Sequence, residues 1–156
     1  MSRLIPKRAW IASAAVTAGL LTTACVPDTT RGRVEHDVAA TFSNQYAQSL
    51  QRQGKPVERP KIKSIECHSG VNVKVDSGPG GWPCEIKYVG ADGKPQDDTF
   101  LTLIDALGCY QAFNVDDTKR YHKVIDVQSH KKIDDPAGSF DGCYDVFDDR
   151  TNTSKK

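Results

Sequence analysis

The sequence predicts an α+β domain in which one N-terminal amphipathic helix packs on an antiparallel β-meander of about four strands, with two disulfides. Apolar residues recur every four positions from Val34 to Leu50, and after Gly54 the chain changes to short alternating segments. A helix followed by a run of strands is typical of the α+β class. Four cysteines lie in or beside those segments: Cys67, Cys84, Cys109 and Cys143.

The helix is predicted from a single apolar stripe with polar residues between its members. Gly54 and then Pro56 provide a stop signal after it. The polar face mixes both signs of charge, so we expect the stripe to pack on a sheet and not on an anionic lipid surface. The stripe consists of Val34, Val38, Phe42, Tyr46 and Leu50.

The strands are predicted from alternation and turn signals. Asp92-Gly93 is a hairpin turn signal. The glycine-rich stretch 77–81 reads as a loop, and no Gly-Lys-Ser/Thr follows it to suggest phosphate binding. Residues 121–127 fit either an edge strand or a short helix. The expected strands are 61–67, 71–75, 82–89, 100–104 and 109–113.

The first 24 residues have the features of a secretory signal peptide. Arg3, Lys7 and Arg8 precede an apolar run from Ala9 to Ala24. That run is shorter than the roughly 20 residues that cross a bilayer. We therefore expect a signal peptide at 1–24, a lipidated cysteine with a tether at 25–33, one α+β domain at 34–150 and a flexible tail at 151–156.

Leu21-Thr22-Thr23-Ala24-Cys25 resembles the lipobox of bacterial lipoproteins, whose cysteine is lipidated and becomes the mature N-terminus. Thr22 stands where leucine is usual, and Thr22 with Ala24 also suits the peptidase that releases secreted proteins. The five cysteines favour lipidation, because an unmodified Cys25 would leave an odd thiol outside the cell. We therefore expect the protein to be anchored at the outer face of the cytoplasmic membrane, and the alternative is that it is secreted.

The predicted mature chain is slightly acidic. Removing the three basic residues of the signal leaves 18 Lys and Arg against 20 Asp and Glu. A nucleic-acid-binding domain would show a basic excess, so nucleic acid is not an expected partner. The expected partners are the membrane, through the N-terminal lipid, and an envelope protein that the sequence does not identify.

The remaining four cysteines allow three disulfide connectivities. We favour Cys67–Cys84 and Cys109–Cys143, because each pair is consecutive and can join neighbouring strands. Neither zinc nor calcium is expected, since the chain has no Cys-x-x-Cys and no Asp-x-Asp-x-Asp-Gly loop. No cofactor is expected.

No catalytic residue is assigned from the sequence. The chain has no His-Glu-x-x-His and no Gly-x-Ser-x-Gly, and its serines have no identifiable base. Trp82 is interpreted as core packing beside a disulfide strand and not as an interface anchor. The histidines are scattered and read as structural: His36, His68, His122 and His130.

Three segments around the cysteines carry a family resemblance. They are Trp82-Pro83-Cys84, then Gly-Cys-Tyr-Gln-Ala at 108–112, then Phe-Asp-Gly-Cys-Tyr at 140–144. Over residues 60–147 the chain resembles small actinobacterial secreted lipoproteins with a lipobox-like cysteine and a four-cysteine α+β domain. The resemblance implies a disulfide-stabilised domain outside the cytoplasmic membrane, and it implies no activity.

The sequence therefore predicts a non-enzymatic binding or envelope-support domain. One alternative is a small-ligand or inhibitor-like module that uses the sheet face away from the helix. The other is an envelope enzyme whose site is assembled from distant segments. A concave pocket that holds His68 or His122 beside several carboxylates would favour the enzyme.

Overall fold

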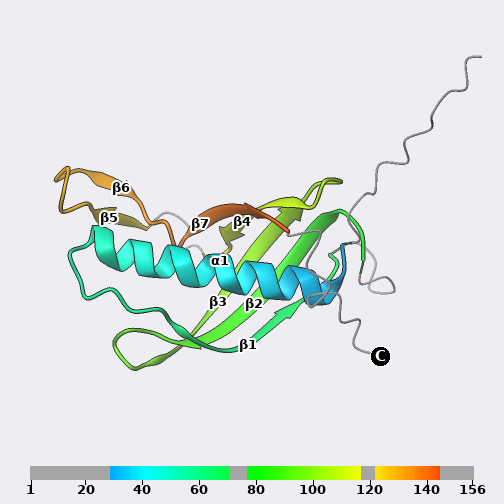
Figure 1. Ribbon diagram of the computed structural model, residues 1–156, viewed down its shortest axis with the longest axis horizontal. Coiled ribbons are helices and arrows are strands. Elements are labelled where there is room, and N and C mark those ends of the chain that lie inside the picture. The colour runs from blue at the N-terminus through cyan, green and yellow to red at the C-terminus, as the bar shows by residue number, and fades with distance from the viewer. Residues whose placement is uncertain (1–28, 71–76, 117–121, 145–156) are drawn as a thin grey trace, which may run out of the picture.

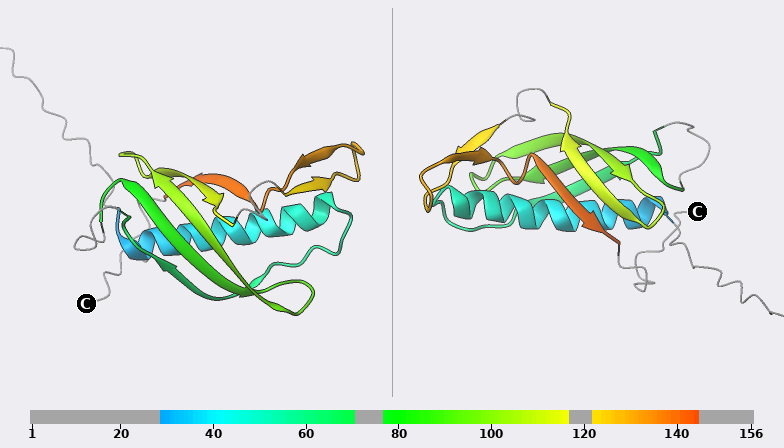
Figure 2. Two further views of the ribbon diagram at one scale, coloured as in Figure 1. Left: turned by 180° about the vertical axis from the view of Figure 1, so that it is seen from behind. Right: turned by 90° about the horizontal axis from the view of Figure 1, so that it is seen from above.

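The computed structural model describes residues 29–70, 77–116 and 122–144. Helix α1 (Arg31–Arg52) lies across one face of a five-stranded antiparallel sheet of order β1-β2-β3-β4-β7 (Figure 1). Seen from behind, the strands lie in front of the helix (Figure 2). The strands are β1 (Lys61–Cys67), β2 (Gly80–Val89), β3 (Pro95–Ile104), β4 (Cys109–Asn114), β5 (Lys123–Ile125), β6 (Lys132–Asp134) and β7 (Ser139–Cys143).

The α+β class is confirmed, but the sheet has five strands and not about four. The additional strand is β7, which pairs with β4. Within its five residues only Phe140 is buried, so its alternation is too short to recognise. The segment 121–127 was expected to form either an edge strand or a short helix. Its residues 123–125 form a strand, which pairs with β6 in a separate two-stranded sheet.

The helix begins at Arg31, inside the segment expected to be a tether. Thr30 forms an isolated bridge with Ser77, and the Gly78 amide donates to the Thr29 carbonyl at 2.9 Å. These contacts fix the chain before the helix starts. The expected signal peptide with Cys25, the expected strand at 71–75 and the expected tail at 151–156 lie outside the described residues.

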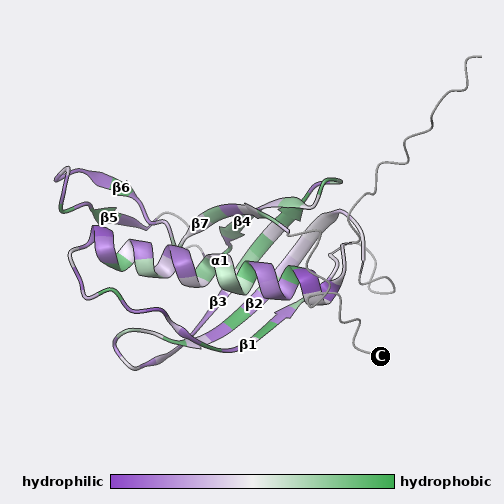
Figure 3. Cartoon of the chain, in the orientation of Figure 1, coloured by the Kyte–Doolittle hydropathy of each residue, from purple (hydrophilic) through white to green (hydrophobic). Residues whose placement is uncertain are grey.

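The core lies between α1 and the sheet, and its centre is the ring of Phe42. That ring is fully buried, with centroids 5.0 Å from Tyr88, 5.5 Å from Phe100 and 6.3 Å from Phe140. Aromatic pairs at such separations contribute beyond simple area burial. Trp82 is 1 % exposed, so its interpretation as a core residue is confirmed. Figure 3 shows apolar residues on the strands behind a largely polar outer surface of the helix.

Both favoured disulfides are present, Cys67–Cys84 and Cys109–Cys143. Each joins residues directly opposite one another, the first between β1 and β2 and the second between β4 and β7. Because β1 and β7 are the two edge strands, each bridge fastens an edge of the sheet to its neighbour. Two such bridges indicate an oxidising environment.

The small β5–β6 sheet is held at the C-terminal end of α1 by Asp126. Its carboxylate accepts hydrogen bonds from the Gln128 amide at 3.0 Å and the Ser129 hydroxyl at 3.0 Å, and it pairs with Arg52 at 3.3 Å. The hydrogen bond from the Gln128 amide is the main cause of a lowered Asp126 pKa. The Val127 amide also donates to the Arg52 carbonyl at 2.8 Å. A two-stranded sheet is marginal alone, so this attachment is what positions it.

Two stacked tyrosines close the other end of the core. The Tyr110 hydroxyl donates to the Asp37 carbonyl at 3.0 Å and lies 2.8 Å from the Thr41 hydroxyl. Gly142 leaves room for this ring, since a Cβ there would lie 2.7 Å from the Tyr110 oxygen. The Tyr144 hydroxyl is buried without a hydrogen-bond partner among the described residues. Burial is the largest cause that raises the pKa of both phenols, to about 12 for Tyr110.

We predict that Phe42→Ala lowers the free energy of unfolding by about 3–5 kcal/mol, because a fully buried ring is replaced by a cavity. Urea unfolding monitored by fluorescence measures the change. Gln48→Ala on the exposed face of the same helix is the matched control and should be close to neutral. Equal effects of the two substitutions would show that the helix does not pack through this ring.

We predict opposite effects of removing the two hydroxyls at neutral pH. Tyr144→Phe should raise the free energy of unfolding by about 1 kcal/mol, because it removes an unsatisfied buried donor. Tyr110→Phe should lower it by about 1 kcal/mol, because its hydrogen bonds are lost.

At alkaline pH, both variants should also differ from the parent protein. A phenol whose pKa is raised in the folded state leaves the stability unchanged below about pH 10, the unfolded value, and lowers it as the pH rises above that value, because the unfolded chain then releases the proton more readily. Each Tyr→Phe change should therefore flatten the alkaline fall in urea midpoint. A midpoint in the parent protein that stays constant from about pH 9 to 11.5 would contradict this account.

Candidate functional site

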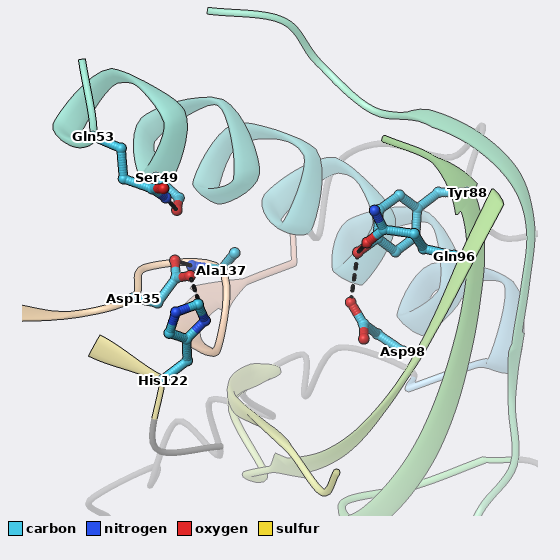
Figure 4. Close-up of polar contacts among 8 residues, drawn as sticks. All are labelled: Ser49, Gln53, Tyr88, Gln96, Asp98, His122, Asp135 and Ala137. Atoms are coloured by element: carbon cyan, nitrogen blue, oxygen red, sulfur yellow. Dashed lines mark hydrogen bonds and ion pairs between the residues drawn. The ribbon is translucent and has the colours of Figure 1, made fainter. Parts of the chain in front are cut away.

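A polar pocket of about 320 Å³ opens where the C-terminal half of α1 meets the sheet and the segment between β6 and β7. Figure 4 shows eight of the residues around it, with α1 above, β2 and β3 on one side and the β5–β7 region on the other. The pocket is placed by packing, because α1 crosses the sheet at this point and the Asp126 contacts hold the third wall.

The inner wall of the pocket is formed by Tyr88, whose hydroxyl is hydrogen-bonded. The Tyr88 hydroxyl donates to Asp98 Oδ2 at 2.7 Å and lies 2.9 Å from the side-chain oxygen of Gln96. Burial, followed by the hydrogen bond with Asp98, raises the pKa of Tyr88 far above its ordinary value. The phenol therefore remains a protonated donor at physiological pH, and the Asp98 side chain is held in place within the protein.

Asn114 provides a second buried polar group at the pocket. The residue is 1 % exposed, and its Oδ1 accepts the Asp116 amide at 2.8 Å. Asn114 also lines the pocket.

The opposite wall carries Asp135 and His122. Asp135 Oδ1 accepts the Ala137 amide at 3.0 Å, and Asp135 Oδ2 lies 4.0 Å from His122 Nδ1. That distance is too long for a hydrogen bond, so the two groups interact directly only as an ion pair when the ring is protonated. Asp135 makes only the smallest contribution to the raised pKa of Tyr88, after burial, Asp98 and Tyr46.

The helix contributes an aromatic ring and a short polar pair. The Tyr46 ring lies edge-on to Tyr88 with centroids 5.7 Å apart. Gln53 Nε2 donates to Ser49 Oγ at 2.9 Å. Lys55 lies at the rim and is exposed. Asp98 and Asp135 line the same pocket as these rings, and two carboxylates there favour a positive charge.

The sequence-predicted residues fall in different places. His122 lines this pocket beside Asp135 and across from Asp98, whereas His68 does not line it. The four bridged cysteines are also outside it, and Cys25 is not among the described residues. Within the described ranges no group of three or more His, Cys, Asp or Glu side chains is placed to hold a metal ion.

Sequence reasoning missed Tyr88, Asp98 and Asn114 as site residues. A signal for Asp98 was available: it is two residues from Phe100, so strand alternation places both on the inner face. An aspartate on an inward position of a strand is rarely buried without a partner. The pairing of Asp98 with Tyr88 required the register of β2 on β3, which the Asp92-Gly93 turn alone does not specify.

The sheet face away from the helix is the other exposed surface of note. Leu101 is 38 % exposed, Leu103 46 % and Val115 43 %. Leu101 pairs with Phe113 on β4, and Pro83 on β2 pairs with Leu101. These apolar residues occupy positions that are usually polar on a solvated sheet face.

Comparison with known proteins gives no relative. No family model matches the chain, and no curated protein or solved structure matches it. In the part of the chain that the structure describes, no helix is long and apolar enough to cross a membrane.

Proposed function

We propose that the chain is an exported, lipid-anchored envelope protein whose domain binds a positively charged group of a partner or ligand. The observation that carries the binding proposal is the pocket lined by two carboxylates, Asp98 and Asp135, together with the Tyr46 and Tyr88 side chains. The disulfides and the sequence before Cys25 support the location. The resemblance of residues 60–147 to actinobacterial lipoproteins is consistent with that location.

The charge of the expected ligand follows from the pocket lining. A carboxylate that is 7 % exposed, as Asp98 is, repels an anion and strengthens any hydrogen bond to a cationic donor. The Tyr46 and Tyr88 rings offer faces or edges to an alkyl stem. A primary amine or a guanidinium of a peptide or small molecule has this combination of charge and apolar stem.

We predict that n-butylammonium binds in the pocket at least about tenfold more tightly than butyrate or n-butanol, because a hydrogen bond to a charged group contributes more than a neutral one. Amide chemical shifts of Tyr88, Gln96 and Asn114 measure binding. Asp98→Asn should weaken ammonium binding by about tenfold while leaving n-butanol unchanged.

The matched control is Asp97→Asn, since Asp97 is exposed one residue earlier on the opposite face of β3. It should leave ammonium binding unchanged. Preference for butyrate, or equal losses in the two variants, would contradict the cation site.

We predict that Cys25→Ala releases the protein from the membrane, because the acyl chains supply the attachment. Membrane fractionation of the full chain and the mass of its N-terminal peptide measure this. A processed Cys25→Ala protein that remained in the membrane fraction would contradict lipid anchoring.

One observation favours a second candidate, an envelope enzyme. His122 lines the pocket with its Nδ1 4.0 Å from Asp135 Oδ2, and a histidine next to a carboxylate is a pair that acid–base sites use. The test is to incubate cell-wall extract with the parent protein and with His122→Gln. A mass change that only the parent protein produces would establish an enzymatic activity. Unchanged ammonium binding by that variant would separate catalysis from binding.

A further inference from the structure

The end of the domain nearest Cys25 carries exposed leucines. Thr29 is hydrogen-bonded to Gly78, and Gly80, two residues later, pairs with Ile104 at the end of β3. The β3–β4 turn, residues 105–108, begins at the next residue. The start of α1 and this turn therefore share one end of the domain, as the two views in Figure 2 also show.

The turn presents Leu107 to the outside. Asp105 Oδ1 accepts the Leu107 amide at 2.8 Å and the Cys109 amide at 2.9 Å, and Gly108 adopts a φ of 80°. These two bonds to Oδ1 fix the turn. The Leu107 side chain is 73 % exposed, the largest value among the exposed apolar side chains of the described residues. Leu103, 46 % exposed, lies close by at the end of β3.

The length of chain before the fold sets its distance from a lipid anchor. Four residue steps separate Cys25 from Thr29, which reach about 14 Å when fully extended. An acylated Cys25 would therefore keep Thr29, and the β3–β4 turn beside it, close to the headgroups.

We propose that the β3–β4 turn docks on the membrane by inserting Leu107 at the boundary between headgroups and acyl chains. This rests on the proposed lipidation of Cys25. One leucine is too weak to bind a bilayer alone, but the anchor makes the contact intramolecular and removes most of the association cost. The inserted Leu107 side chain is apolar, so its contact with a zwitterionic bilayer does not depend on salt.

The test uses the lipidated full chain reconstituted in phosphatidylcholine vesicles that contain brominated lipid. Leu107→Trp places a reporter in the turn. Ile125→Trp is the matched control, because Ile125 is 51 % exposed on β5 at the other end of α1. Trp82 is buried and serves as the background in both variants.

We expect roughly threefold stronger quenching at position 107 than at position 125, unchanged between low and high salt. Equal quenching at the two positions would overturn the docking. Burial of the reporter at 107 in vesicle-free solution, together with a dimer in sedimentation, would assign the turn to a second copy and also overturn it. A missing acyl mass on Cys25 would instead overturn the anchor on which the docking rests.

Discussion

The packing of Phe42 between the helix and the sheet is the contact on which the other features depend. It joins one residue of α1 to β2, β3 and β7 through Tyr88, Phe100 and Phe140. Those strands come from distant parts of the sequence, so this ring sets where the helix crosses the sheet. The disulfides join the two edge strands of the sheet to their neighbours. Disulfides at both edges of the sheet are a usual way to stabilise a small core in an oxidising environment.

The crossing position gives the two ends of α1 different surroundings. At its N-terminal end lie Thr29 and the β3–β4 turn, and at its C-terminal end lie the polar pocket and the β5–β6 sheet. A helix of 22 residues is about 33 Å long at about 1.5 Å per residue. If the anchored end faces the membrane, the pocket opens well away from the headgroups, where a soluble partner can reach it. Anchoring and binding would then use separate surfaces joined by one rigid helix.

Much of the architecture could be predicted from local patterns. The four-residue spacing from Val34 to Leu50 identified the helix, and alternation identified β1, β2 and the end of β3. The strand β7 was missed because Phe140 is its only buried residue. The early helix start was missed because Thr29 and Thr30 are fixed by residues 77 and 78, which are remote in sequence.

The pocket was less accessible to sequence reasoning than the fold. Its walls come from α1, from β2 with β3, and from the segment after β6, so no single motif contains it. His122 was considered only conditionally, since nothing in the sequence places it in one pocket with Asp98 and Asp135. Nothing in the sequence around Asn114 indicates that its side chain is buried at a pocket. Sites assembled across elements depend on register and crossing position, and neither follows from local composition.

Hydrogen–deuterium exchange of the lipidated protein on vesicles, compared with the unanchored Cys25→Ala protein in solution, tests most directly whether one end of α1 faces the membrane. The account predicts that membrane-dependent protection is confined to the β3–β4 turn and the first turn of α1. It predicts no change at β5, β6 and the residues around the pocket. Protection at β5 and β6, with none at the β3–β4 turn, would contradict it.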